Sequence, residues 1–208
     1  MAYLEGDDKA ASATSAPKLE IDTATQRLRG VRFLPSPNAD SRPDSSDISL
    51  LVVHAISLPP GQFRSNSHSD WYIDDLFLNR LDPAQHPFFA ALQGLHVSAH
   101  ACIYRDGSIT QYVPFDRRAW HAGESAFEGR SRCNDFSIGI ELEGCDEQPF
   151  TDAQYRALAR VILALQQTYP RIGRANIVGH ADIAPLRKTD PGPHFDWQRL
   201  YFELDYPR

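Results

Sequence analysis

Apolar positions along the chain fall into short runs separated by polar and turn-forming residues. The run 48–53 is almost continuously apolar, which predicts a strand buried on both faces, with His54 at its tip. In the run 138–143, Ile and Leu alternate with Gly and Glu. Side chains on a strand point to opposite faces in turn, so Glu141 and Glu143 project from the same face of a second strand.

Turn and capping chemistry mark a hairpin and a helix. The dipeptide Asp-Gly at 106–107 separates the β-prone runs 97–104 and 109–113, which predicts an antiparallel hairpin. Residues 151–154 read Thr-Asp-Ala-Gln, a capping-box pattern, and apolar residues follow at helical spacing until Pro170. This helix is expected to pack against the core and to carry no function of its own.

Shorter patterns complete the expected elements. Residues 83–92 predict a short packed helix that starts near a proline, and 195–202 predict a final helix. The short run 177–179 predicts a third strand. Strands that alternate with helices, together with one antiparallel hairpin, predict an α/β fold: a single domain with a mixed central β-sheet flanked by helices.

The composition is that of one globular domain. The chain has 208 residues, of which 42% are hydrophobic and 23% charged. Residues 1–18 are rich in small and polar types and are expected to form a flexible N-terminal tail, which leaves 19–208 as the domain. The net charge of −6 argues against nucleic acid as a partner, because binding to a phosphate backbone requires a basic surface.

The cysteines and the hydropathy pattern indicate a compartment. Cys102, Cys133 and Cys145 form neither an even set nor a C-x-x-C pair, so we expect free thiols in a reducing environment. The N-terminus lacks the apolar core of a signal peptide, and no stretch approaches ~18 apolar residues. We therefore expect a soluble, cytoplasmic protein that does not enter a membrane.

The segment 179–193, GHADIAPLRKTDPGP, concentrates candidate chemistry. It places an imidazole (His180), a cation (Lys188) and a carboxylate (Asp190) in one short stretch whose prolines predict irregular backbone. His54, at the end of its strand, is the best candidate for a third ligand. Two histidines and a carboxylate would hold Zn²⁺ with a fourth position open for water.

Spacing alone leaves other interpretations open. The segment lacks the tight spacing of an H-E-x-x-H motif, so its polar residues could equally cap a helix or form turns. His68 and His86 lie in polar segments and are interpreted as solvated. His100 lies on the predicted hairpin, where hydrogen bonding within the sheet is the favoured interpretation, although its side chain could face the site.

Four long motifs carry a resemblance to a known family. They are LLVVH at 50–54, VSAHACIYRDGSITQYVPFDRRAWHAGES at 97–125, CNDFSIGIELEG at 133–144, and GHADIAPLRKTDPGP at 179–193. Over residues 32–199 the chain resembles the cytosolic N-acetylmuramoyl-L-alanine amidases of the AmpD type. That family belongs to a zinc amidase superfamily that also includes phage amidases and peptidoglycan recognition proteins.

The resemblance implies a fold like that of the peptidoglycan recognition proteins and a set of roles. Carried over by position, it implies Zn²⁺ as cofactor, with the ligands His54, His180 and Asp190. It selects Glu141 over Glu143 as the acid/base carboxylate and Lys188 as the second catalytic residue. It also places Trp120 in the substrate cleft and makes Arg132 a partner for a substrate carboxylate.

The implied function is hydrolysis of the amide between N-acetylmuramic acid, in its 1,6-anhydro form, and L-alanine in muropeptides, a step of peptidoglycan recycling. The expected partner is a small muropeptide, and the protein is expected to be a monomer. One alternative is an amidase that acts on polymeric peptidoglycan, and another is a peptidoglycan-binding module without catalysis. The complete set of implied ligands and catalytic residues disfavours the binding module.

The chain departs from the AmpD-type pattern at three positions. Ala55 stands where Asn is expected, Phe88 where Tyr can occur, and His96 where Arg is expected. These differences leave the predicted hydrolysis intact and concern the recognition of the sugar and the peptide.

Overall fold

The computed structural model describes residues 18–64 and 71–207. Nearly all of the expected flexible tail, and His68, therefore lie outside the described residues. Within the described ranges, no helix is both long enough and apolar enough to span a bilayer. Cys102, Cys133 and Cys145 are all free, as predicted.

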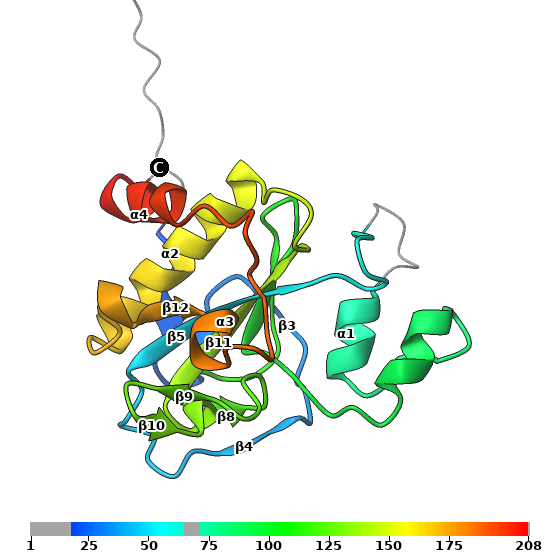
Figure 1. The fold of residues 1–208 in the computed structure, drawn as a ribbon. Coiled ribbons are helices and arrows are strands. Elements are labelled where there is room, and N and C mark those ends of the chain that lie inside the picture. The colour runs from blue at the N-terminus through cyan, green and yellow to red at the C-terminus, as the bar shows by residue number, and fades with distance from the viewer. Residues whose placement is uncertain (1–17, 65–70, 208) are drawn as a thin grey trace, which may run out of the picture.

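A six-stranded mixed sheet forms the centre of the molecule (Figure 1). In spatial order its strands are β12 (Ile177–Gly179), β5 (Leu50–Ile56), β11 (Ser137–Glu143), β6 (Ala101–Ile103), β7 (Ile109–Gln111) and β3 (Arg32–Phe33). The β6–β7 pair is antiparallel and every other neighbouring pair is parallel. The mixed sheet and the hairpin at Asp106-Gly107 confirm the predicted fold class.

The two faces of this sheet pack against different parts of the molecule. On one face, Leu51 and Val53 join the core that packs against α2 (Asp152–Thr168) and α4 (Trp197–Asp205) (Figure 1). On the other face, Leu50 and Val52 pack with residues of the surrounding loops and of α3 (His180–Ile183). Because strand side chains alternate, His54 lies on this second face.

Helix α2 begins as its sequence predicts. The Thr151 hydroxyl accepts a hydrogen bond from the backbone N–H of Gln154, and the Gln154 side chain accepts one from the backbone N–H of Thr151. Leu158, Ile162 and Leu165 are completely buried against the sheet core. The capping box and the buried apolar stripe together account for the helix.

Three predicted elements differ in detail. The helix expected over 83–92 is a 3₁₀ helix, η1 (Pro87–Leu92), which starts later because His86 caps it by accepting from the N–H of Phe88. β5 continues two residues beyond His54, because it keeps pairing with β11 up to Ile56. The stretch 179–193 contains one helical turn, α3, and is therefore not irregular throughout.

Short elements surround the sheet. They are β1 (Ile21–Asp22) with β2 (Arg27–Leu28), β4 (Ala39–Ser41) with β8 (Arg117–Ala119), β9 (Ala126–Phe127) with β10 (Arg130–Ser131), η2 (Cys133–Asp135) and η3 (Arg174–Asn176). The helix α1 (Tyr72–Phe77) stands together with η1 beside the sheet (Figure 1).

A buried carboxylate attaches α1 to the sheet. Asp74 is 1% exposed, and its Oδ1 accepts hydrogen bonds from the hydroxyls of Tyr104, at 2.7 Å, and Tyr112. Its Oδ2 accepts from the Arg32 guanidinium at 2.7 Å. These bonds join α1 to side chains from β3 and from both sides of the β6–β7 hairpin.

We expect Asp74→Asn to lower the free energy of unfolding by about 1–3 kcal/mol, because an amide group replaces an acceptor-only carboxylate among buried donors. Urea denaturation measures this change. The neighbouring variant Asp75→Asn is the control: its carboxylate makes an exposed pair with Arg80, so stability should change by no more than about 0.5 kcal/mol. Equal effects of the two substitutions would contradict the anchoring role of Asp74.

Candidate active site

Three polar side chains converge near the carboxyl ends of two parallel strands. His54 lies on β5, and His180 follows β12 directly, whose Gly179 pairs with Val53. Asp190 comes from the loop after α3. The His54 and His180 Nδ1 atoms are 3.0 Å apart, and each lies 3.1 Å from Asp190 Oδ2. The structure thus brings together all three candidate ligands from distant parts of the chain, in a group able to hold a metal ion.

The partner of His180 Nε2 determines whether His180 Nδ1 carries a proton or a lone pair. His180 Nε2 lies 3.1 Å from the carbonyl oxygen of Ala122, which can only accept, so His180 carries its proton on Nε2. Its Nδ1 therefore presents a lone pair to Asp190 Oδ2 and His54 Nδ1. The contact of His180 Nδ1 with Asp190 Oδ2 joins two acceptors, which is unfavourable unless a cation lies between them. The donor set therefore fits a bound metal ion.

The local environment keeps His54 and Asp190 in the form that binds metal. Burial, with smaller contributions from neighbours, lowers the pKa of His54 to about 4, so its imidazole is neutral at pH 7. Burial alone would raise the pKa of Asp190, but the contacts with His180 and His54 outweigh it and hold that pKa below its ordinary value. Neutral imidazoles and an ionised carboxylate are the forms that bind metal.

Glu141 lies beside this group. The parallel register of β11 and β5 pairs Glu141 with His54. Its Oε2 is buried, and none of the described residues donates a hydrogen bond to it. Burial raises the pKa of Glu141 well above its ordinary value, and Asp190 adds to the shift while Lys188 opposes it. A partly buried carboxyl in a cleft, with one buried oxygen that receives no hydrogen bond from the described residues, is a candidate for proton transfer.

Glu143 projects from the same side of β11 but has a different environment. Its two carboxylate oxygens accept hydrogen bonds from the backbone N–H groups of Arg64, at 2.5 Å, and Arg105, at 3.0 Å. It is 2% exposed. Glu143 therefore holds two loops in place and is not available for chemistry.

A cleft of about 540 Å³ opens over these groups. Lys188 and Trp120 line it, as do the three positions that depart from the AmpD-type pattern. An apolar wall of the cleft includes Leu76 and Phe77 of α1. That wall is the part of the molecule that Asp74 anchors.

Arg132 lies outside this cleft. It borders a smaller depression of about 250 Å³, which shares Trp120 with the main cleft. Its backbone is left-handed at φ 63°, and its Nε lies 3.1 Å from Asp135 Oδ2. The structure therefore separates Arg132 from the group of His54, His180 and Asp190.

His121 is a site residue that sequence reasoning missed. Its Nδ1 lies 2.9 Å from His54 Nε2, and its Nε2 lies 3.1 Å from the Ser137 hydroxyl. A Cβ on Gly139 would stand 2.4 Å from the His121 ring, so the glycine makes room for it. The available signal was chemical: a metal-binding histidine usually places its second nitrogen on a partner, and His121 follows Trp120 directly.

His100 is structural, in agreement with the favoured interpretation. It is completely buried, its Nδ1 accepts from the Gly139 N–H at 3.0 Å, and its Nε2 lies 3.0 Å from the Arg117 carbonyl oxygen. Burial, together with the nearby positive charge of Arg42, lowers its pKa to about 3.

This depressed pKa makes stability depend on pH. His100 takes up a proton near pH 6.5 in the unfolded chain but only near pH 3 in the folded chain. Protonation therefore favours the unfolded chain, and the free energy of unfolding falls as the pH drops below about 6.5. Between pH 7 and pH 5 the loss is about 2 kcal/mol. In urea unfolding, the free energy of unfolding of His100→Gln should fall between pH 7 and pH 5 by this amount less than that of the wild type. The exposed control His194→Gln should show the same fall as the wild type. Identical slopes for wild type and His100→Gln would contradict this account.

Comparison with known proteins identifies the family and agrees with the fold. The family model for N-acetylmuramoyl-L-alanine amidase matches residues 44–193. The 1,6-anhydro-N-acetylmuramyl-L-alanine amidase AmpD of Escherichia coli K12 is 60% identical over 173 residues, which are 83% of this chain and 91% of that protein. This chain is also similar to a crystal structure of a selenomethionine derivative of AmpD. The TM-score is 0.81 at 56% identity, over 88% of this chain and 97% of the other.

A more distant structure carries a ligand. It is the N-acetylmuramyl-L-alanine amidase AmiD of Escherichia coli in complex with the substrate anhydro-N-acetylmuramic acid-L-Ala-D-γ-Glu-L-Lys, with a TM-score of 0.55 and 34% identity over 76% of this chain and 57% of AmiD. The structural matches confirm the predicted amidase fold. With most of its length matched by the family model and by a relative at 60% identity, the chain belongs to the N-acetylmuramoyl-L-alanine amidase family.

Proposed function

We propose that this protein is a zinc-dependent amidase that cleaves the bond between the lactyl group of 1,6-anhydro-N-acetylmuramic acid and L-alanine in soluble muropeptides. The observation that carries the proposal is the convergence of His54, His180 and Asp190 in one cleft with Glu141, whose Oε2 receives no hydrogen bond from the described residues. The names of the relatives described above supply the substrate class.

The ligand triangle supports zinc. Ligand atoms about 2.0–2.1 Å from one tetrahedral zinc ion lie about 3.4 Å from each other. The observed separations of 3.0–3.1 Å need to widen by only a few tenths of an ångström. When bound, zinc polarises the substrate carbonyl and lowers the pKa of a water ligand to about 7.

Glu141 would move the proton in this reaction. None of the described residues donates a hydrogen bond to its Oε2. This oxygen is therefore available to accept a proton from the attacking water and return it to the leaving amine. The repulsion from Asp190 is neutralised when that carboxylate ligates a cation. The loss of this repulsion, together with the positive charge of the cation itself, would favour the ionised form of Glu141 against the burial that raises its pKa.

The remaining roles follow from position in the cleft. Lys188 lines it, and its ammonium group would stabilise the oxyanion that develops on the substrate carbonyl. Trp120 offers a flat apolar face to the sugar or the acyl group. Because the smaller depression continues from Trp120, a peptide stem that extends past this ring would reach the Arg132 guanidinium, which suits a carboxylate.

A non-catalytic binding module needs neither a complete ligand set nor a free buried carboxylate, so these residues favour catalysis. The alternative of a polymeric substrate requires the cleft to accept a continuous glycan strand, and a comparison of soluble and polymeric substrates tests this alternative. The cytoplasmic location and the monomeric state stay predictions.

We expect Glu141→Gln to keep about one zinc per chain but to lose about 10²–10⁴-fold in kcat, because the amide cannot accept the proton. Asp190→Ala is the matched comparison and should lose zinc and activity together. Metal content by atomic emission and product release by mass spectrometry separate the two effects. Normal turnover in Glu141→Gln would refute the assigned role, and full zinc in Asp190→Ala would refute the ligand set.

The substrate assignment predicts that a purified anhydro-muropeptide is cut far faster than insoluble sacculi at matched amide concentration. A concave cleft with a stacking face favours a compact ligand that fits within it. Mass spectrometry of the released peptides measures both rates, and the metal-free Asp190→Ala protein gives the background. Equal or faster release from sacculi would favour the polymeric alternative and leave the amidase chemistry in place.

A further inference from the structure

Two consecutive residues contact both candidate metal-binding rings from outside. His121 presents its Nδ1 to His54 Nε2 at 2.9 Å, and Ala122 presents its carbonyl oxygen to His180 Nε2 at 3.1 Å. The loop that carries these residues leads from β8 to β9. The orientation of both imidazoles therefore depends on where this loop lies.

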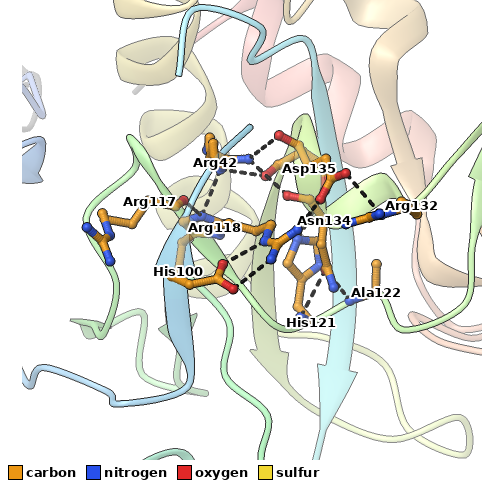
Figure 2. Close-up of polar contacts among 11 residues, drawn as sticks. Arg42, His100, Arg117, Arg118, His121, Ala122, Arg132, Asn134 and Asp135 are labelled. Carbon is orange, nitrogen blue, oxygen red and sulfur yellow. Dashed lines mark hydrogen bonds and ion pairs between the residues drawn. The ribbon is translucent and has the colours of Figure 1, made fainter. Parts of the chain in front are cut away.

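A single side-chain oxygen holds the same two residues. Asn134 Oδ1 accepts a hydrogen bond from the backbone N–H of His121 at 3.1 Å and another from that of Ala122 at 2.8 Å (Figure 2). An amide oxygen has two lone pairs, so it can accept both hydrogen bonds at once. Asn134 thus fixes the loop at the two residues that meet the rings.

The backbone that carries Asn134 is itself held from behind. Arg42 is 7% exposed, and its Nη1 donates to the carbonyl oxygens of Asn134 at 3.0 Å and Asp135 at 3.2 Å. Its Nη2 donates to the Ser137 carbonyl oxygen at 2.8 Å. On the other side, the Asp135 carboxylate accepts from Arg118 at 2.5 Å (Figure 2). The η2 turn is therefore a rigid support for its central side chain.

We propose that Asn134 is a positioning residue, which fixes both metal-binding imidazoles through the backbone of His121 and Ala122. The inference rests on the proposed zinc site. Without the two bonds to Asn134, the loop shifts and both rings lose the partners that orient them. Removing such outer partners typically costs about 10–100-fold in metal affinity.

Two other roles for Asn134 make different predictions. Asn134 also lines the cleft, so direct contact with substrate would change KM and leave the binding of metal alone intact. A merely structural role would lower stability without a specific effect on metal. Zinc affinity measured in the absence of substrate separates these roles from positioning.

The test compares Asn134→Leu, which has no acceptor, with Asn134→Asp, which keeps the acceptor oxygens in nearly the same shape. The stability control is Gln111→Leu. Gln111 is a buried amide on β7, which is separated from β11 by β6. Its side chain accepts a hydrogen bond from the Leu28 N–H at 2.8 Å and donates one to the Val113 carbonyl oxygen at 3.1 Å. Chelator competition with zinc alone gives the affinity, urea unfolding gives the stability, and the absorption spectrum of the cobalt-substituted protein reports ligand geometry.

We expect Asn134→Leu to bind zinc about 10–100-fold more weakly and to alter the cobalt spectrum, with Asn134→Asp close to wild type. Gln111→Leu should lose stability without losing zinc affinity. If Asn134→Leu does not fold, Asn134→Ser replaces it, since a hydroxyl on a shorter side chain cannot reach both N–H groups and should also weaken zinc binding. If the Leu or Ser variant binds zinc as tightly as the wild type, or if Asn134→Asp is weakened equally, the positioning role is wrong. In either case zinc binding by the wild type still supports the proposed function. A wild-type protein that binds no zinc would overturn the proposed function as well.

Discussion

The close approach of three electron-pair donors is the constraint on which the rest of the structure depends. One atom each of His54, His180 and Asp190 lies within 3.1 Å of the others, although His180 Nδ1 and Asp190 Oδ2 are both acceptors and repel unless a cation joins them. The parallel pairing of β12 with β5 supplies two of the three positions, because it sets Gly179 beside Val53. A sheet buried on both faces is rigid enough to keep donors in such an arrangement.

The buried face of β11 shows how environment assigns chemistry. Glu141 and Glu143 are two residues apart on one strand, yet two backbone N–H groups satisfy Glu143 and Oε2 of Glu141 receives no bond from the described residues. An unsatisfied buried carboxyl costs free energy, and proteins tolerate this cost mainly where the group has work to perform. The difference arises from the loops that dock on Glu143 and not from the strand.

Support comes to the cleft from two sides. Behind the histidines, Arg42 and Asn134 connect the η2 turn to the loop that contacts both rings. At the apolar wall, the Asp74 carboxylate ties α1 to the β6–β7 hairpin through Tyr104 and Tyr112 and to β3 through Arg32. Both connections are hydrogen bonds of buried or partly buried charged and amide groups, whose strength depends on exclusion of water. The geometry of the cleft therefore depends on polar contacts as much as on apolar packing.

Sequence alone determined the elements whose signals are local. The apolar run 48–53, the capping box at Thr151 and the turn at Asp106-Gly107 each depend on neighbouring residues, and the structure contains all three. The segment 179–193 and the strand end at His54 supplied the candidate ligands, and the motif resemblance supported them and selected Glu141. Tertiary structure decided the rest. The contact of His54 with His121 spans 67 positions, and the bonds that remove Glu143 from the chemistry come from Arg64 and Arg105. Hydrogen bonds between distant segments, and the burial that strengthens them, leave no periodic trace in the chain, because they exist only once those segments pack together.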